Sequence, residues 1–398
     1  MRKYIYFRNS MHVKTSGVMG KMNVPKKIVA IAAILALVMI AGASLTLQRP
    51  AGPSQTTITT QTGTGPALGR RIGLLGAGAS FPYPLISKWA QEYEILTNGM
   101  VTINYQSIGS GGGIKQITER AIDFGATDAP LTPDEAKRAP GLLHIPETIG
   151  AVVLAYNLPG IDKRLKLSGD VLADIYLGKI VKWNDPRIAS MNEGMALPDR
   201  EIVVVKRSDS SGTTFIFTDY LSTVSGEWMR NVGRGKVFNY PEALSARGVQ
   251  AKGNEGVTAI IKQTPYSIGY VELTYALQNN IPYALLRNKA GRFVEANFET
   301  IASAASAAFP KLPKGDEPWD KVSIVDAEGE GSYPIASFTY ILVYKDLSYM
   351  GKEKAQALVG FLRWAVTEGQ KYCKDLYYVP LPPEVQRLNL ETISMIRI

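Results

Sequence analysis

Residues 108–117 read IGSGGGIKQI, and a serine with four glycines fills five consecutive positions of this stretch. Each glycine loses more backbone entropy on ordering than any other residue, so the cluster needs a reason, for example a close approach of the backbone to another group. The overlapping residues 101–109, VTINYQSIG, alternate apolar and polar positions like a strand, and Ile114, Ile117 and Ala121 follow at helical spacing. The order strand, glycine loop and helix predicts a ligand at the N-terminus of the helix.

Two further segments place hydroxyl residues at the start of an expected helix, as Ser110 does at the cap position of the first. In residues 76–84, GAGASFPYP, Ser80 precedes a helix opened by prolines, which the first helical turn tolerates. Residues 206–217, KRSDSSGTTFIF, follow a strand and begin a helix at residues 211–213. A serine at such a position often only caps its helix. Three such starts are more than capping requires, and they favour a small anion bound by amide and hydroxyl donors.

Three charged residues accompany these helix starts. Arg207 supplies the one obvious charge-assisted donor, and Asp209 can orient it, although a surface salt bridge is the alternative for this pair. Asp128, in DFGATDAP, would repel a fully ionised anion, so it indicates a ligand that carries a proton. A buried acceptor left unpaired by an unprotonated anion such as sulfate can reject that anion by about four to five powers of ten. The alternative role of Asp128 is a helix cap or turn residue before Pro130.

The remainder of the chain predicts an α/β fold, because short apolar strands alternate with helical patterns from Ile72 onward. Besides the strand in residues 101–109, the expected strands are Val152–Asn157, Ile202–Val205, Ile268–Val271 and Thr339–Tyr344. The expected helices are Pro84–Leu96, Gly212–Ser222, Val257–Gln263 and Lys352–Glu368.

The net charge of +9 over 398 residues comes from the N-terminal part of the chain. No Asp or Glu occurs before Glu92, whereas ten of the 44 Lys and Arg residues lie upstream of Ile72. From Ile72 onward, 34 basic residues therefore stand against 35 acidic ones. A chain without a basic excess in its globular part is not expected to bind nucleic acid.

The first 71 residues have the pattern of a segment that directs a protein to or across a membrane. Residues 1–27 form a basic cytoplasmic leader, and the uncharged residues 28–47 form either a membrane anchor or a cleaved signal segment. Lysines before the apolar segment predict export of the rest of the chain, beginning with a flexible Thr/Ser/Gly-rich linker over residues 48–71. Cys373 is the only cysteine, which excludes an internal disulfide and a lipid-bearing cysteine after the apolar segment.

Together these segments resemble the phosphate-binding receptors of high-affinity phosphate ABC transporters. The similarity runs from about Gly76 to the C-terminal region and also includes DIYLGKIVKWNDP (174–186) and IGYVE (268–272). Several such motifs in the family's order are far more specific than a lone glycine loop. The resemblance implies that phosphate is held by Ser80, the Phe81 amide, Ser110, Asp128, Arg207, Ser211, Gly212 and Thr213, with Asp209 positioning Arg207.

The resemblance also implies a two-lobed periplasmic-binding-protein fold of type II, in which each lobe is a mixed sheet flanked by helices. Lobe I would comprise residues 72–155 and 336–398, and lobe II residues 156–335. Two crossing segments near Tyr156 and Ala336 would form the hinge about which the lobes close on the ligand.

The partners implied are inorganic phosphate, the permease subunits of an ABC importer with their cytoplasmic ATPase, and the membrane through the N-terminal segment. The expected protein is an exported monomer at the outer face of the cytoplasmic membrane, without cofactor, metal or enzymatic activity. Ser80 stands where the family often has threonine, and Lys206 replaces an arginine often found beside the binding one.

Three alternatives have less support in the residues. A receptor for sulfate, molybdate or tungstate would have no use for Asp128, because these ions are unprotonated at neutral pH. An exported phosphatase with Ser80 or Ser110 as nucleophile would lack an evident base, since His144 is the only histidine after the linker. An adhesion or surface-layer protein would account for the stalk but not for the clustered site.

Overall fold

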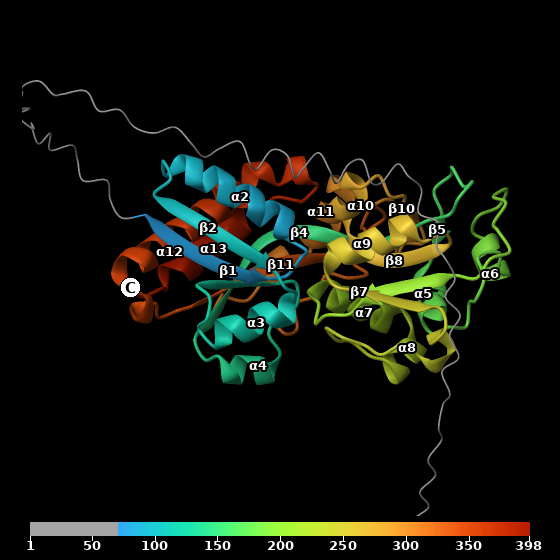
Figure 1. The fold of residues 1–398 in the computed structure, drawn as a ribbon, viewed down its shortest axis with the longest axis horizontal. Coiled ribbons are helices and arrows are strands. Elements are labelled where there is room, and N and C mark those ends of the chain that lie inside the picture. The colour runs from blue at the N-terminus through green and yellow to red at the C-terminus, as the bar shows by residue number, and fades with distance from the viewer. Residues whose placement is uncertain (1–70) are drawn as a thin grey trace, which may run out of the picture. The chain divides into compact units, whose positions relative to one another are not determined.

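Strands and helices alternate along residues 71–398, the part of the chain that the computed structural model describes (Figure 1). The predicted leader (1–27), the membrane anchor or signal segment (28–47) and the linker up to residue 70 lie outside the described residues. Within residues 71–398, no helix combines the length and the apolar character needed to cross a membrane.

The elements fall into two groups along the chain. The first and last parts of the chain contain β1 (Ile72–Gly78), α2 (Tyr83–Leu96), β2 (Val101–Ser107), α3 (Ser110–Thr118), β3 (Phe124–Thr127), α4 (Pro133–Arg138), β4 (Leu142–Tyr156), β11 (Ala336–Tyr344), α12 (Lys352–Val366) and α13 (Pro383–Ser394). The middle part contains β5 (Lys166–Leu167), α5 (Gly169–Tyr176), α6 (Pro186–Ala189), β6 (Val203–Arg207), α7 (Gly212–Val224), α8 (Gly226–Asn231), β7 (Gly248–Ala251), α9 (Gly253–Gln263), β8 (Ser267–Glu272), α10 (Leu273–Gln278), β9 (Leu285–Arg287), β10 (Phe293–Val294) and α11 (Phe298–Ser306).

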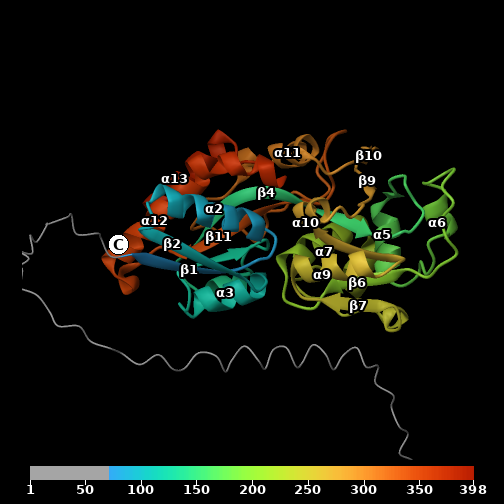
Figure 2. The same ribbon diagram turned by 45° about the horizontal axis from the view of Figure 1, so that its top comes forward.

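Eight of the strands form one mixed sheet in the order β2-β1-β3-β11-β4-β8-β6-β7. β1 is parallel to β2 and β3, β6 is parallel to β7 and β8, and the antiparallel strands β11 and β4 lie between these two parallel groups. Helices flank each half of the sheet, so the protein has two lobes (Figures 1 and 2). This arrangement agrees with the predicted α/β, two-lobed fold.

β4 is the strand that joins the two halves of the sheet. It pairs with β11 as far as Ala151 and with β8 from Val152 onward. The amide of Val152 donates a hydrogen bond of 2.9 Å to the carbonyl of Ile335, one residue before β11 begins at Ala336. The chain therefore leaves the first half of the sheet and returns to it at neighbouring points.

The length of β4 was not predicted. The expected strand Val152–Asn157 corresponds only to the end of β4, which begins ten residues earlier, at Leu142. All fifteen residues of β4 are buried, and a strand buried on both faces lacks the alternating pattern that reveals a half-exposed strand. The helix predicted to begin at Val257 is α9, which begins four residues earlier, at Gly253. Glycines in this first turn hid the start of the helix.

The C-terminal part of the chain packs on the first half of the sheet. α12 contacts β1, and the indole Nε1 of Trp89 in α2 donates to the carbonyl of Gly369 at 2.8 Å. Trp89, Phe124 and Phe361 are fully buried, and the rings of Phe124 and Phe361 lie 5.7 Å apart between their centroids. Burial of each such side chain contributes about 1.5–3 kcal/mol, so these contacts hold the C-terminal helices to the first strands.

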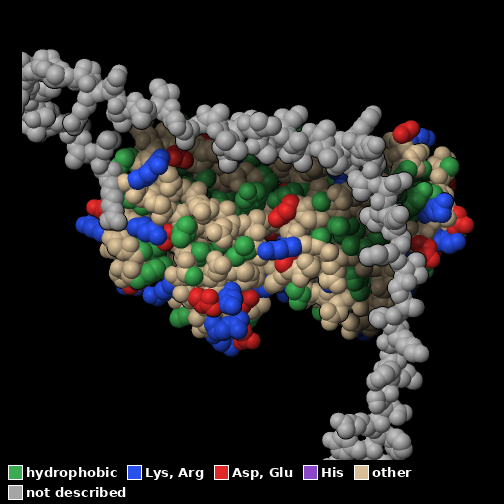
Figure 3. Space-filling model, in the orientation of Figure 1, with side chains coloured by type: hydrophobic (Ala, Val, Ile, Leu, Met, Phe, Trp, Pro, Cys, Tyr) green, Lys and Arg blue, Asp and Glu red, His purple; other side chains and the backbone are tan. Residues whose placement is uncertain are grey.

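Acidic and basic side chains are interspersed on the face of the protein that Figure 3 shows. Many acidic and basic side chains of residues 71–398 form ion pairs, such as Lys88 with Glu92 (2.6 Å) and Lys182 with Asp199 (2.7 Å). This distribution agrees with the near-neutral charge of the chain from Ile72 onward.

Candidate functional site

Four helices begin just after neighbouring strands and bring their first residues together between the two halves of the sheet. α2 follows β1, α3 follows β2, α7 follows β6 and α9 follows β7 (Figures 1 and 2). Because β1 is parallel to β2 and β6 is parallel to β7, each pair of strands ends at one edge of its half of the sheet. The buried residues Ser80, Ser110, Gly212 and Asn254 lie at or next to these four helix starts.

Ser80 is held from the opposite half of the sheet by Asn254. Its Oγ accepts hydrogen bonds from the Asn254 amide (3.1 Å) and from Asn254 Nδ2 (2.9 Å). Asn254 Nδ2 also donates to Thr213 Oγ1 at 3.1 Å, so the starts of α2, α7 and α9 are linked through one side chain. Ser80 makes no capping hydrogen bond to α2, whose cap residue is Pro82. The capping alternative for Ser80 is therefore wrong.

Ser110 links three segments of the chain. Its Oγ accepts hydrogen bonds from the amides of Gly212 (3.0 Å) and Asp128 (3.3 Å). The prediction that Ser110 is the cap residue is wrong, because Gly109 occupies the cap position with a φ of 85° and Ser110 is the first residue of α3. The Ser110 hydroxyl thus contacts the start of α7, in the other half of the sheet, as well as Asp128.

The glycines around Ser110 allow close approaches of the backbone. A Cβ on Gly111 would lie 2.2 Å from Ser210 Oγ, and a Cβ on Gly113 would lie 2.5 Å from the Cα of Gly78. The amide of Gly111 donates to the carbonyl of Ser210 at 3.0 Å. At Gly111 and Gly113, the absence of a side chain therefore allows segments of the protein to pack against each other.

Asp128 is buried at the centre of this network. Its Oδ1 accepts from Thr339 Oγ1 at 3.0 Å, and its Oδ2 lies 3.5 Å from Thr213 Oγ1. Burial raises the pKa of Asp128 to about 7, although the Thr339 hydroxyl and the charge of Arg207 act in the opposite direction. A carboxyl in these surroundings changes its protonation near neutral pH, which is the behaviour expected at a functional site rather than at a turn.

Arg207 is fixed by a bidentate ion pair. Its Nε and Nη2 donate to the two carboxylate oxygens of Asp209 at 2.8 and 2.5 Å, and its Nη1 lies 3.4 Å from Thr213 Oγ1. The side chains of Arg207 and Asp209 are 1% and 12% exposed, so this pair is not a surface salt bridge. Burial acts to raise the pKa of Asp209, but the hydrogen bonds and charge of Arg207 outweigh it and lower the pKa. The ion pair with Asp209 therefore fixes the orientation of the guanidinium.

Ser211 and Phe81 flank the network in different ways. Ser211 is the cap residue of α7, and its Oγ accepts from the amide of Thr214 at 3.1 Å. Phe81 directly follows Ser80, its side chain is buried, and its carbonyl accepts from the hydroxyl of Tyr378 at 2.7 Å. The structure thus connects seven of the nine predicted residues by hydrogen bonds, Ser80 through Asn254, and Phe81 and Ser211 are their immediate neighbours in the chain.

The sequence and the fold can be compared with known proteins. A family model described as the PBP superfamily domain matches residues 51–368. The phosphate-binding protein PstS of Xylella fastidiosa is 47% identical over 317 residues, which cover 79% of this chain and 83% of that protein. PstS of Methanocaldococcus jannaschii is 45% identical over 333 residues, 80% of this chain and 85% of that protein. This chain belongs to the PstS family.

The fold of this PstS-family chain can also be compared with a solved structure. The phosphate ABC transporter substrate-binding protein of Clostridium perfringens, determined with bound phosphate, aligns with a TM-score of 0.56 at 18% identity. The alignment covers 78% of this chain and all of that one. At this identity the likeness shows a shared fold.

Two residues of this PstS-family network were missed from the sequence. Asn254 lies in QAKGNEGV, residues 250–257, which repeats the order strand, glycine and helix start seen in the other segments. That repetition was a usable signal. Thr339 lies inside β11 and reaches Asp128 across the sheet, and a threonine in a buried strand carries no such signal.

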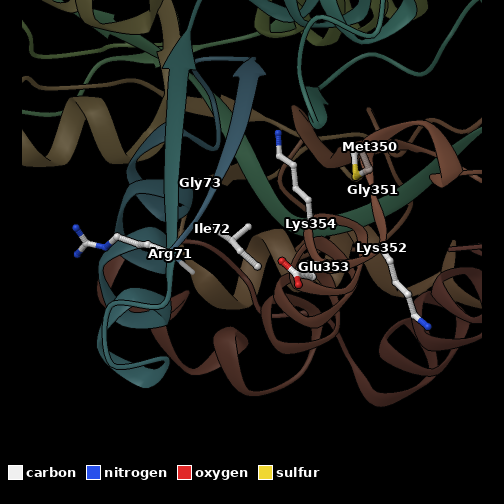
Figure 4. A pocket seen from close by; sticks show the side chains of 8 residues that line it. All are labelled: Arg71, Ile72, Gly73, Met350, Gly351, Lys352, Glu353 and Lys354. Atoms are coloured by element: carbon white, nitrogen blue, oxygen red, sulfur yellow. The ribbon is translucent and has the colours of Figure 1, made fainter. Parts of the chain in front are cut away.

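The PstS-family network is separate from a surface cavity of about 460 Å³ at the other end of β1 (Figure 4). This cavity lies where β1 starts and where α12 begins, and Arg71 and Lys352 point away from each other there. Lys354, which also lines it, forms an ion pair with Asp123 at 2.7 Å. The basic groups therefore do not converge on a common point, and none of the predicted site residues lines this cavity.

Proposed function

We propose that this chain is an extracytoplasmic receptor that captures inorganic phosphate between its two lobes and delivers it to an ABC-type phosphate importer. Membership of the PstS family supports this function, and the names of the relatives describe a binding protein rather than an enzyme. The observation that carries the proposal is the buried network in which the hydroxyls of Thr213 and Thr339 contact the carboxyl of Asp128 and the guanidinium of Arg207 reaches Thr213.

The chemistry of this network suits a tetrahedral anion with one proton. Hydroxyls of Ser80, Ser110 and Thr213, amides at the starts of α3 and α7, and the guanidinium of Arg207 can replace the hydration shell of an oxyanion. Ser211, Gly212 and the Phe81 amide complete the proposed contacts, and Asp209 keeps Arg207 in place. Asp128 would accept the O–H of hydrogenphosphate, which sulfate lacks, so it would discriminate between two ions of similar size and charge.

The sheet supports the proposed division into lobe I (72–155 and 336–398) and lobe II (156–335). The change of partner along β4 between Ala151 and Val152, next to Ile335, gives two adjacent crossings that can act as a hinge. Across this division run the hydrogen bonds between Ser110 and Gly212, Ser80 and Asn254, and Gly111 and Ser210. Closure through these contacts would bury the anion and exclude water.

The proposed setting is the outer face of the cytoplasmic membrane. The basic leader and the apolar residues 28–47 support export, with the apolar segment either retained as an anchor or cleaved. We propose a monomer that meets the permease subunits with its ligand enclosed, while the ATPase acts on the cytoplasmic side.

Isothermal titration of the full chain, solubilised in a non-ionic detergent, with phosphate and separately with sulfate tests this function. Phosphate is expected to bind at one site per chain, and sulfate at least a thousandfold more weakly, because it leaves Asp128 unpaired. Absence of phosphate binding would overturn the proposal. Equal affinities for both ions would retain the receptor but remove the role of Asp128 as a proton reader.

A further inference from the structure

Glu147 lies in a β-bulge behind the candidate site. In the pairing of β4 with β11, Thr148 faces Thr339 and Pro146 faces Tyr340, so Glu147 is the extra residue of the bulge. Its carbonyl accepts from Gln370 Nε2 at 2.9 Å, and its side chain is fully buried. A bulge next to a functional site commonly re-aims a side chain. Here it directs the carboxyl of Glu147 toward Thr339.

The hydroxyl of Thr339 lies between two carboxyl groups. Its Oγ1 is 3.0 Å from Glu147 Oε1 and 3.0 Å from Asp128 Oδ1, with the carbonyl of Thr127 at 3.3 Å. A hydroxyl carries one hydrogen, so it can donate along only one of the two short contacts. The other short contact needs a hydrogen from a carboxyl group, and one of these two acids must therefore be protonated.

The surroundings favour Glu147 as the protonated group. Asp128 lies near the guanidinium of Arg207 and the hydroxyl of Thr213, which stabilise its charged form. Within residues 71–398, Glu147 has no ion-pair partner, and its Oε2 has no hydrogen-bond partner. An unpaired oxygen is less costly on a neutral carboxyl than on a carboxylate.

The titratable groups around Glu147 also favour its protonated form. Asp128 lies on the far side of Thr339. Besides burial, the charge of Glu147 also contributes to raising the pKa of Tyr105 in β2 and of the Cys373 thiol. Burial, followed by the repulsion from Asp128, raises the pKa of Glu147 to about 8, against the opposing effect of Thr339. None of these neighbours offers a positive charge.

We propose, on the basis of the phosphate-binding function inferred above, that Glu147 is a positioning residue for ligand discrimination. Its carboxyl proton is donated to Thr339 Oγ1, which directs the hydroxyl hydrogen of Thr339 to Asp128 Oδ1. Asp128 is thereby held as an ionised acceptor with its other oxygen available to the O–H of phosphate. When Glu147 loses its proton, it competes for the Thr339 hydrogen and repels Asp128, which weakens this arrangement.

Glu147→Gln tests the proposal, because the amide keeps a hydrogen for Thr339 but does not ionise. Phosphate affinity of the full chain is measured by isothermal titration from pH 6.5 to 9.5. The variant is expected to match the wild type within about threefold at pH 6.5 and to bind about tenfold more tightly than the wild type at pH 9.5, the value of one hydrogen bond to a charged group. A constant ratio of the two affinities across this range would overturn the proposal.

Glu272→Gln is the matched control. Glu272 is also a fully buried carboxyl, but its oxygens contact Thr274 and the hydroxyl of Tyr378, and within residues 71–398 no hydrogen bond joins them to Asp128. Its phosphate affinity is expected to change with pH as that of the wild type does. A Glu272→Gln profile that matches that of Glu147→Gln would show a general effect of buried charge and would contradict the specific role of Glu147.

Thr339→Val is a second variant that tests the proposal if Glu147→Gln does not fold. Removal of the hydroxyl should lower the preference for phosphate over sulfate about tenfold at pH 7, because Asp128 loses its oriented donor. An unchanged preference and an unchanged pH profile would overturn the proposal. If the wild type binds no phosphate, the proposed receptor function is wrong. If the wild type binds phosphate but has the same pH profile as its variants, the receptor function stands and only the role of Glu147 is wrong.

Discussion

Ser110 and Gly212, which lie 102 positions apart in the chain, are joined by a hydrogen bond of 3.0 Å from the amide of Gly212 to the hydroxyl of Ser110. The bond connects the first residue of α3 to the first residue of α7. A Cβ on Gly212 would lie 2.5 Å from both Ser110 Oγ and Asp128 Oδ2. Gly212 thus lies where the two halves of the sheet are in direct contact at the site.

Gly212→Ala is expected to weaken phosphate binding roughly ten- to hundredfold, because the added methyl group would overlap two oxygens that the closed protein brings together. Titration of the variant and the wild type with phosphate measures this loss. Gly331→Ala is the control, since a Cβ there would have no neighbour within 4 Å. Equal affinities of Gly212→Ala and the wild type would show that ligand binding does not require this contact.

Asp128→Asn is expected to reduce the preference for phosphate over sulfate at least a hundredfold at pH 8. The amide of asparagine can donate to a sulfate oxygen, whereas the carboxylate of Asp128 can only accept a hydrogen from the ligand. Competition between the two ions in isothermal titration measures the ratio. Asp134→Asn removes a charge from an exposed position in α4 and should leave the ratio unchanged. A ratio preserved in Asp128→Asn would contradict the assigned role.

Sulfate binding by the wild type should strengthen as the pH falls from 8 to 6. Asp128, with its pKa raised to about 7 by burial, takes up a proton in this range, and the protonated acid can donate to a sulfate oxygen. Sulfate itself keeps both charges, so the sulfate affinity should rise about tenfold in total between pH 8 and pH 6, in step with the protonated fraction of Asp128. Asp128→Asn should lack this dependence. A flat sulfate profile of the wild type would show that Asp128 does not contact the ligand.

An ion pair joins residues on the two sides of the proposed lobe boundary, and we expect it to stabilise the closed form. Lys236 Nζ lies 2.6 and 2.7 Å from the two carboxylate oxygens of Glu135, and both side chains are 14% exposed. The carbonyl of Lys236 also accepts from the amide of Ser211 at 2.9 Å, which places the pair next to the site. Lys236→Met should therefore release phosphate faster and weaken its affinity roughly three- to tenfold.

Stopped-flow dissociation and titration of Lys236→Met measure both effects. Lys182→Met is the matched control, because Lys182 pairs with Asp199 in the same lobe and both side chains are about half exposed or more, at 49% and 66%. The control should leave the dissociation rate unchanged. A Lys236→Met protein with the dissociation rate of the wild type would show that this pair does not stabilise closure.

The sequence located most residues of the buried network, but it located the strands of the sheet less completely. Ser80, Ser110 and Gly212 could be found because each follows a strand and opens a helix, a local pattern of hydroxyls and glycines. Thr339 could not be found, because its role depends on a contact with Asp128 that lies 211 positions away and on its register in β11. Glu147 was hidden for the same reason, since the bulge that aims its side chain exists only in the pairing of β4 with β11.

The buried carboxyl of Glu147 also makes a prediction about stability without ligand. Its pKa is raised from 4.5 to about 8 in the folded protein, mainly by burial. Between these values the folded state holds a proton that the unfolded state releases, so the free energy of unfolding should fall as the pH rises. Glu147→Gln removes this dependence. The stability of the variant relative to the wild type should therefore increase from about pH 5 to about pH 8, by at most about 1.4 kcal/mol per pH unit, and then level off.

Urea denaturation of the ligand-free wild type and Glu147→Gln, followed by tryptophan fluorescence at several pH values, measures this difference. Asp128 also titrates near neutral pH, but it is present in both proteins and cancels in the comparison to first order. A difference in the free energy of unfolding that stays constant from pH 5 to 8 would mean that Glu147 is ionised in the folded protein throughout. In that case Asp128, and not Glu147, would have to supply the second proton at the two short contacts of Thr339, contrary to the arrangement inferred from the bulge.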